Sequence, residues 1–486
     1  MAPFSLMPPR SLFADVAIAA LLAVAVAGLH AATSFGRVWS GDGRLLAEWT
    51  VRLDVSERYH NALYVPAAWL CDALLPRGLL AAADDPLALA KSLSSASAGV
   101  GAAFSYLCCR LLGSARWAGV AGTALFCVSP GLWFFGSAIE VHAQHFAVVA
   151  FCALATLVLP WRRPVVATAL ATAVFLLPCL SHQTAPLLGP GWILLVQCAR
   201  RRVGPPFSVK ALLAVGAALL AAVVCGHMLV QWRRGLGFAM NLFGAAAEVG
   251  VWHQGFRPSL VWTEVLWPLF LCVPVALIAC CWRAIDPWLR ACGALTLASL
   301  IAGVLWWGIM ENGGYLLGAG FVLAALVASL WSVLPRRAAV ATAVLAVGAQ
   351  FLAGWHYVRD FDAGGFQVED RVRQVRAHLG TRGVLLSCND NAPNIAIWLP
   401  AVQEHTLIPT LIDEGPMEAW FATIYPVLLG CLDAGPLALD ASYRFRPDFP
   451  DRLKNRLSLV EAALRRDCRV TEFDDPCWPL LVLEKR

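Results

Sequence analysis

The sequence has few charged residues for its length. Only 14% of its 486 residues are Asp, Glu, Lys or Arg, whereas 59% are hydrophobic. The mean hydropathy of +0.66 is that of a chain rich in long apolar runs. A soluble protein of this size has no core that could bury so much apolar surface. The composition therefore excludes an ordinary soluble protein and predicts a polytopic α-helical membrane protein in a lipid bilayer.

Basic tracts and metal-binding motifs are also missing. The net charge of +5 falls in short loops and is not interleaved with aromatic residues, so nucleic acid is not an expected partner. The 16 cysteines contain no CxxC motif, and most lie in apolar runs, where cysteine acts as a small hydrophobe. Four others lie in the polar C-terminal region, where one or two disulfides can form if the compartment is oxidising: Cys388, Cys431, Cys468 and Cys477.

Apolar runs of about 20 residues are long enough to cross a bilayer. About eleven such runs occur, near 13–32, 92–112, 117–135, 142–160, 164–181, 184–199, 210–231, 260–282, 290–310, 315–334 and 338–355. Arg10 alone precedes the first run, and no small-residue cleavage site follows it, so we expect an uncleaved span. Pro178, Pro186 and Pro190 interrupt two runs, as kinks in membrane helices do.

Arginine and lysine gather in five short loops. With eleven spans and the N-terminus inside, all five clusters fall on the cytoplasmic side, as the positive-inside rule requires. The clusters are Arg110 with Arg116, Arg162 with Arg163, Arg200–Arg202 with Lys210, Arg283 with Arg290, and Arg336 with Arg337. Arg233 and Arg234 are the exception. The alanine-rich composition hints at a bacterial source, so we expect the inner membrane of a bacterium.

The same topology places a set of polar positions together on the opposite face. They are the Gly41-Asp42-Gly43 loop, Glu140 with His142 and His145, Ser181-His182-Gln183, the Arg233–Arg257 loop, and Glu311-Asn312-Gly313-Gly314. Such residues are often simple interfacial anchors, but so consistent a set indicates a cavity open to that side. A carboxylate on a glycine-flanked turn is a plausible catalytic position, because glycine lets a substrate approach. An ordinary solvated turn is the alternative.

The chain divides into two expected domains. Residues 1–355 form the membrane part, whose first outer loop, 33–91, contains a short interfacial helix at Asn61–Leu75 with Trp69 and Tyr64 at headgroup depth. Residues 356–486 are more polar. There we expect an amphipathic helix around Arg371–Arg376, a buried strand at Gly383–Ser387, a helix at 452–467 and a last strand at 479–484. We interpret this region as a small extracytoplasmic α/β domain.

Three stretches carry a resemblance to a known superfamily. They read SGDGRLLAEW at 40–49, SAIEVHAQHFAVVAF at 137–151 and LSHQTAPLLGPGWILL at 180–195. With the order of spans, they resemble the GT-C membrane glycosyltransferases, and most closely the transmembrane protein O-mannosyltransferase-like group. One departure is clear. Where that group has a His-Pro-Pro-Gly segment, this chain has only His60, Tyr64 and Pro66 as remnants.

The resemblance implies an inverting sugar transfer from a polyprenyl-phosphate donor to an acceptor hydroxyl on the extracytoplasmic face. Asp42 takes the place of the family's acidic catalytic residue and would act as general base. Glu140 would position substrate. The remaining candidates would bind the phosphate or sugar: Arg44, Arg58, Arg233, Arg234, His60, His142 and His182. Donors of this kind do not require a metal, so we expect neither metal nor other cofactor.

Each candidate also has a structural interpretation. Glu140 can cap a helix, His182 can satisfy the kink at Pro178, and Arg233 with Arg234 can be interfacial anchors. His142 and His145 are spaced to share a metal, but no third ligand is visible. Glu311–Gly314 and Asn389–Asn391 are first of all turns.

Two other functions stay open from sequence. One is a transporter or flippase for a lipid-linked glycan or a related amphiphile, although no internal repeat is evident. The other is a structural membrane subunit with an outer binding domain. An enzyme requires Asp42 and Glu140 to face one cavity, whereas a transporter requires a path through the bilayer.

Overall fold

The computed structural model has two compact units. It describes residues 9–34, 46–47, 49–50, 62–76, 78–81, 85, 87–233, 257–307, 313–363, 368–379, 383–387, 402–406, 416–444, 451–473 and 479–486. The first unit is a helical bundle that ends at Phe361, and the second begins at Asp362. Residues 46, 47, 49 and 50 of the first loop group with the second unit, whereas the sequence analysis assigned that loop to the membrane part.

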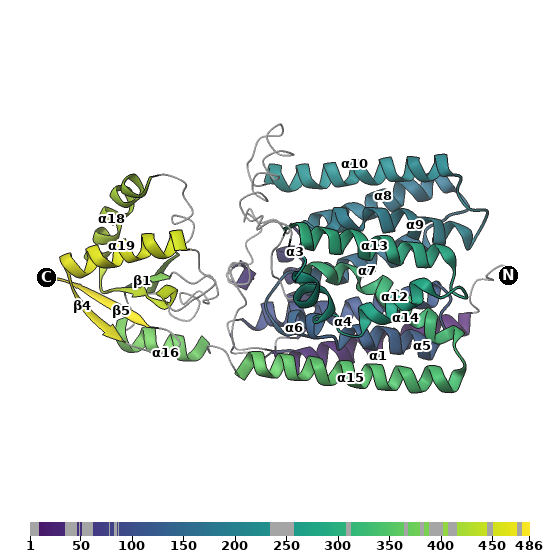
Figure 1. Ribbon diagram of the computed structural model, residues 1–486, viewed down its shortest axis with the longest axis horizontal. Helices are drawn as coiled ribbons and strands as arrows, with labels where there is room; N and C mark the ends of the chain where they lie inside the picture. The colour runs from purple at the N-terminus through teal and green to yellow at the C-terminus, as the bar shows by residue number, and fades with distance from the viewer. Residues whose placement is uncertain are drawn as a thin grey trace. The chain divides into compact units, whose positions relative to one another are not determined.

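The first unit is built entirely of helices (Figure 1). They are α1 Pro9–Ala32, α3 Tyr64–Leu74, α4 Ala88–Leu111, α5 Arg116–Cys127, α6 Pro130–Ser137, α7 His142–Val158, α8 Pro164–Ser181, η1 Ala185–Leu188, α9 Gly189–Arg201, α10 Val209–Arg233, η2 Val261–Leu266, α12 Cys272–Cys281, α13 Pro287–Trp307, η3 Gly314–Ala319, α14 Gly320–Val333 and α15 Arg336–Ala363. Each predicted span coincides with one helix or with two helical pieces.

Not every helix of the bundle meets the length and apolar composition that a membrane crossing requires. Among the described residues, six helices are long and apolar enough to cross a membrane, or seven if α5 and α6 form one span bent by 68°. The bend follows from the local sequence. Ser129 caps α6 by accepting a hydrogen bond from the Leu132 amide at 3.4 Å, and Pro130 occupies its first turn. The eleven spans therefore stay a prediction.

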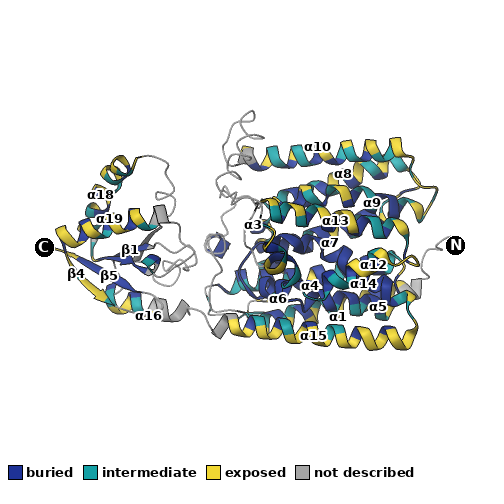
Figure 2. Ribbon diagram, viewed as in Figure 1, coloured by how far each residue is buried: buried dark blue, intermediate teal, exposed yellow. Residues whose placement is uncertain are grey.

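The bundle has a buried centre and an apolar outside. In the span that η3 and α14 form together, 89% of the most apolar window is buried, whereas in α1 the corresponding fraction is 17% and in α15 it is 22% (Figure 2). Close packing around α14 depends on small residues. A side chain at Gly122 of α5 would place its Cβ 2.6 Å from the backbone oxygen of Ala324. The exposed leucines and valines of the peripheral helices are suited to contact lipid rather than water.

The predicted interfacial helix is present as α3. Its Tyr64, Val65, Ala68 and Cys71 are buried, whereas Trp69 is 46% and Leu74 69% exposed. One side of the helix, which includes Tyr64, is therefore buried in the bundle, and the exposed side carries the apolar Trp69, Leu70 and Leu74.

The second unit is a small α/β domain around a five-stranded sheet. The strands are β1 Gly383–Ser387, β2 Val402–Thr406, β3 Leu437–Asp440, β4 Cys468–Phe473 and β5 Leu480–Lys485, in the order β2-β1-β3-β5-β4. β1 is parallel to β2 and β3, and β5 is antiparallel to β3 and β4. The helices are α16 Val368–Leu379, α18 Met417–Ala434 and α19 Asp451–Asp467, with α16 on one face of the sheet and α18 and α19 on the other (Figure 1).

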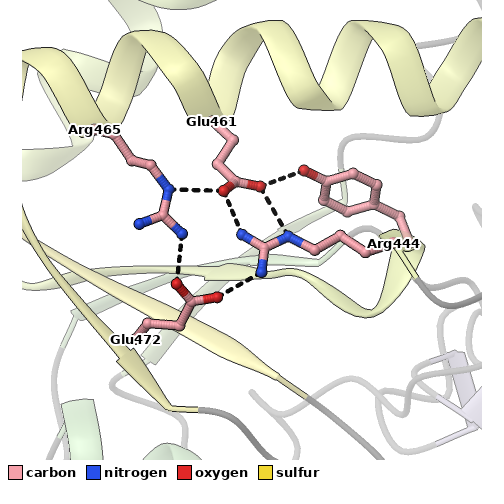
Figure 3. Close-up of polar contacts among 5 residues, drawn as sticks. Arg444, Glu461, Arg465 and Glu472 are labelled. Atoms are coloured by element: carbon pink, nitrogen blue, oxygen red, sulfur yellow. Dashed lines mark hydrogen bonds and ion pairs between the residues drawn. The ribbon is translucent and has the colours of Figure 1, made fainter.

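An apolar core and a charged network hold this domain together. The core joins Val384 and Leu439 of the sheet to Trp420 of α18 and Leu457 of α19. At its edge, the Glu461 carboxylate accepts hydrogen bonds from Arg444, Arg465 and the Tyr443 hydroxyl, and both arginines also pair with Glu472 (Figure 3). Burial alone would raise the pKa of Glu461, but these hydrogen bonds outweigh it and lower the pKa.

The structure of this domain reduces the number of disulfide pairings that are possible among the four C-terminal cysteines. Cys431 and Cys468 are both free thiols. Cys388 and Cys477 lie outside the described residues, so theirs is the single pairing within this set of four that stays open.

Candidate active site at the histidine end of the bundle

One end of the bundle carries the predicted arginine clusters. There the Asp15 carboxylate of α1 accepts hydrogen bonds from Arg110 Nε at 3.1 Å and from Arg116 Nε at 2.8 Å. Arg202 donates to the carbonyl of Leu157 at 3.1 Å, and Arg201 pairs with Asp286 at 2.9 Å. Helix α1 begins at this same end (Figure 1). We call it the arginine end.

The opposite end carries a cluster of aromatic and imidazole rings. His142 begins α7, His182 follows the last residue of α8, and Tyr315 lies in η3. The ring centroids of His142 and His182 are 4.9 Å apart, those of His145 and His182 also 4.9 Å, and Tyr315 lies 5.6 Å from both His142 and His182. Phe135 closes one side at 4.5 Å from His142. We call this the histidine end.

Hydrogen bonds determine which ring nitrogens carry protons. Ser181 donates its hydroxyl hydrogen to the Pro178 carbonyl at 2.8 Å, so His145 Nδ1 must be the donor in its 2.7 Å contact with Ser181 Oγ. His182 Nδ1 accepts from the Thr184 amide at 3.2 Å, which makes Nε2 the protonated nitrogen. His145 Nε2 is thus a buried acceptor that lacks a hydrogen-bond partner in the described part of the chain.

Glu140 lies at the edge of this cluster. Its side chain is 3% exposed, and its carboxylate accepts a hydrogen bond from the Val141 amide at 2.6 Å, just before α7 begins. Val141 is itself the N-cap residue of α7, and its helix end has no side-chain cap among the described residues, so the helix-capping interpretation of Glu140 is not supported. Glu140 precedes His142 by two residues, so it lies beside the ring cluster.

A hydrogen-bonded clasp joins the end of α1 to the end of α6. Thr33 Oγ1 lies 3.0 Å from Ser137 Oγ and accepts from Trp133 Nε1 at 2.8 Å, while Ser34 donates to the Ser137 carbonyl at 3.2 Å. Gly136 is required here, because a Cβ would lie 1.8 Å from His30 Nδ1. The clasp brings the start of the first loop close to the turn that carries Glu140.

Glu264 is a buried acidic residue that the sequence reasoning missed. It lies in η2, is 3% exposed, and accepts a hydrogen bond from the Gly313 amide at 3.0 Å. A signal was available, because a carboxylate inside the apolar run 260–282 is by default a candidate functional residue. The prediction of a turn at Glu311–Gly314 did not include Glu264 as the hydrogen-bond partner of Gly313.

The predicted site residues divide into two groups. Glu140, His142 and His182 are brought together at the histidine end. Asp42, Arg44, Arg58, His60 and Arg234 lie outside the described residues, as does the side chain of Arg233. Within the described ranges, no group of three or more His, Cys, Asp or Glu side chains converges as metal ligands do.

No protein-family model and no curated protein matches the sequence. Solved structures do match. The chain is similar to ArnT from Cupriavidus metallidurans bound to undecaprenyl phosphate, with a TM-score of 0.58, 12% identity and coverage of 97% of this chain and 98% of that one. It is also similar to the arabinofuranosyltransferase AftD from Mycobacteria, with a TM-score of 0.50 and 13% identity, over 99% of this chain and 40% of AftD.

These likenesses extend over both units. Because the match to ArnT covers nearly all of each chain, it includes the bundle and the C-terminal domain in the same order. The similarity shows that this chain shares the fold of these two structures, which agrees with the predicted helical bundle followed by a small C-terminal domain. The identities of 12% and 13% are too low to carry over residue roles, so function is argued from the site itself.

Proposed function

We propose that this chain is an inverting membrane glycosyltransferase that uses a polyprenyl-phosphate-linked sugar as donor. The observation that carries the proposal is the cluster of Glu140, His142 and His182 at the end of the bundle where α1 leads into the first loop, within a fold shared with a protein crystallised with undecaprenyl phosphate. The proposed setting is a bacterial inner membrane, with this end and the C-terminal domain on the extracytoplasmic side. The acceptor carries a hydroxyl group. The mannosyltransferase-like group is the nearest proposed relation, with a changed segment at His60–Pro66.

The proposed chemistry is a single displacement. The acceptor oxygen attacks the anomeric carbon on the face opposite the phosphate, the bond between that carbon and the phosphate oxygen breaks, and polyprenyl phosphate leaves with the electron pair. The acceptor hydroxyl gives its proton to Asp42, the proposed general base. Glu140 and His182 would hold sugar hydroxyls, one as acceptor and the other through its Nε2–H.

The phosphate needs cationic or hydrogen-bonding partners while it departs. Arg44, Arg58, Arg233 and Arg234 are proposed for this task, with His60 and His142 as further donors. No metal or other cofactor is required by such a displacement. A buried carboxylate and the neighbouring imidazole rings together can supply acceptors and donors for sugar hydroxyls.

The test is sugar transfer in membranes that contain the chain, with radiolabelled polyprenyl-phosphate sugars as donors. Wild type, Asp42→Asn and the control Asp286→Asn are compared. Asp286 caps α13 through the Trp288 amide at 2.8 Å at the arginine end, and asparagine preserves that cap. We expect transfer by the wild type and the control, and a loss of roughly 10²–10⁴-fold in Asp42→Asn, the range of general-base catalysis.

Two other outcomes would change the conclusion. Equal transfer by wild type and Asp42→Asn would move the base to another residue, with Glu140 the next candidate. If no donor is used, and labelled lipid-linked sugar instead crosses the bilayer of vesicles that contain the chain, a transporter replaces the enzyme.

A further inference from the structure

We propose that Glu264 is a positioning residue of the candidate active site, which holds the segment Gly313–Tyr315 against His142. The inference rests on the proposed function for its effect on sugar transfer. Its structural part, a carboxylate that holds a turn in place, can be tested separately.

The local sequence explains why Glu264 lies where it does. Pro268 lacks an amide hydrogen, so the Glu264 carbonyl cannot receive its ordinary α-helical hydrogen bond. The chain instead forms the π-helix η2, with a 2.8 Å bond from the Trp267 amide to the Trp262 carbonyl. A π-helical turn inserts one residue into the helical path and is frequent at functional sites.

Glu264 and Gly313 fit together tightly. Gly313 has a φ of +77°, a left-handed conformation that glycine adopts without strain, and a Cβ there would lie 2.5 Å from the Cβ of Pro268. In this conformation its amide points at the Glu264 carboxylate and donates the 3.0 Å hydrogen bond. A hydrogen bond from an amide to a buried carboxylate is stronger than one between neutral groups.

The segment held in this way forms one wall of the histidine cluster. A Cβ at Gly314 would lie 2.6 Å from His142 Cδ2, so backbone and ring are in direct contact. Tyr315 follows immediately, with its ring 5.6 Å from those of His142 and His182. One turn further, a Cβ at Gly318 would approach His145 Nε2 to 3.1 Å. A shift of Gly313 is therefore transmitted to each of the three imidazoles.

Two substitutions separate positioning from a direct chemical role. Glu264→Gln keeps an oxygen that accepts from the Gly313 amide but removes the charge, whereas Glu264→Ala removes both. We expect Glu264→Gln to keep kcat/KM within about threefold of wild type. In Glu264→Ala we expect a fall of roughly 10–100-fold, the order of loss that a displacement of about 1 Å produces.

A matched control lies at the arginine end. Ser332 accepts a hydrogen bond from the Ala115 amide at 2.9 Å, which is likewise a side chain holding a backbone amide. Ser332→Ala should leave transfer unchanged. If it lowers transfer as much as Glu264→Ala, the effect is general loosening of the bundle and the proposal is wrong.

Hydrogen exchange tests whether Glu264 holds this segment in place, and it needs no substrate. We expect peptides covering 313–319 to lose protection in Glu264→Ala and to keep it in Glu264→Gln. Retained protection in Glu264→Ala would overturn the proposal, as would a Glu264→Gln variant that is as inactive as Glu264→Ala while its exchange is normal. If the wild type transfers no sugar, the proposed function fails, and the exchange comparison still decides whether Glu264 holds this segment.

Discussion

The two ends of the helical bundle differ in the groups that donate hydrogen bonds to their buried carboxylates. At the arginine end, cations meet carboxylates and helix carbonyls, as in the pairing of Asp15 with Arg110 and Arg116. At the histidine end, the two buried carboxylates, Glu140 and Glu264, accept hydrogen bonds from backbone amides. The rings around them are held by Ser181 and Thr184.

This difference suits the arginine end to anchoring the bundle and the histidine end to binding a ligand. Several guanidinium groups of the arginine end donate to carboxylates and carbonyls of the protein itself, and such groups at helix ends suit a fixed boundary between protein and water. The histidine end, by contrast, contains a buried acceptor, His145 Nε2, that has no hydrogen-bond partner among the described residues. A site of that kind can bind hydroxyl groups. Four predictions test the comparison, from the largest expected effect to the smallest.

The first prediction concerns the arginine end. Asp15 is buried, and it also accepts from the Tyr106 hydroxyl at 2.8 Å. Asp15→Ala leaves two guanidinium groups without their carboxylate, so the free energy of unfolding should fall by about 3 kcal/mol. Thermal unfolding in detergent measures this. The half-exposed Asp286, replaced in the same way, should cost about 1 kcal/mol. Equal effects would contradict the burial argument.

The second prediction concerns Glu140. If its charge holds a sugar hydroxyl, Glu140→Gln should lower kcat/KM by roughly 10–100-fold, the value of a hydrogen bond to a charged group. Stability should change little, because glutamine still accepts from the Val141 amide. The comparison uses transfer kinetics and melting temperature together. Normal transfer by Glu140→Gln would leave this residue only its hydrogen bond to the Val141 amide.

The third prediction tests close packing at the histidine end. Gly314→Ala forces a Cβ to within 2.6 Å of the His142 ring, so the ring must move. We expect a loss of stability of about 1–3 kcal/mol, as for other overpacked cores, and a lower rate of transfer. Gly348 of α15 provides the control, because no atom lies within 4 Å of the Cβ position there. Gly348→Ala should be neutral or stabilising, and a destabilised Gly348→Ala would show that helix glycines matter here for another reason.

The fourth prediction extends the comparison to the C-terminal domain, where charge is again matched by opposite charge. The pKa of Glu461 is lowered below its ordinary value of 4.5 in the folded protein. Its contribution is therefore complete above that value and is lost as the pH falls through the folded pKa. After screening by solvent the effect should be about 0.5–1 kcal/mol.

Unfolding of the full chain between pH 7 and pH 3 tests this, with hydrogen exchange of Asp451–Phe473 as the local probe. Glu461→Gln should be less stable than wild type at pH 7 and should approach it in acid. Glu418→Gln, at an exposed position of α18, should behave like wild type throughout. If Glu461→Gln is still less stable than wild type at pH 3 by the same amount as at pH 7, the assignment is wrong.

Local sequence was enough to predict much of the fold. The apolar runs coincide with helices, α8 matches its predicted limits of 164–181, and β1 matches Gly383–Ser387, because a continuous apolar strand buried in a parallel sheet is easily recognised. Glu140, His142 and His182 were singled out because they lie at helix ends on one predicted face. Pro178, which was expected to kink its span, lies inside α8, whereas the break between α5 and α6 at Ser129–Pro130 was not predicted.

Other features depended on contacts between distant segments. Glu264 was overlooked because its partner, the Gly313 amide, is 49 residues away in the chain. His145 was considered only as half of a metal pair, whereas its hydrogen bond to Ser181 determines which nitrogen stays an acceptor. The sequence by itself determined the membrane-protein class, the helical segments and the presence of a C-terminal α/β domain, because each follows from local hydrophobicity. Only the tertiary structure decided which side chains meet, because glycines such as Gly136 and Gly314 set how closely separate helices approach.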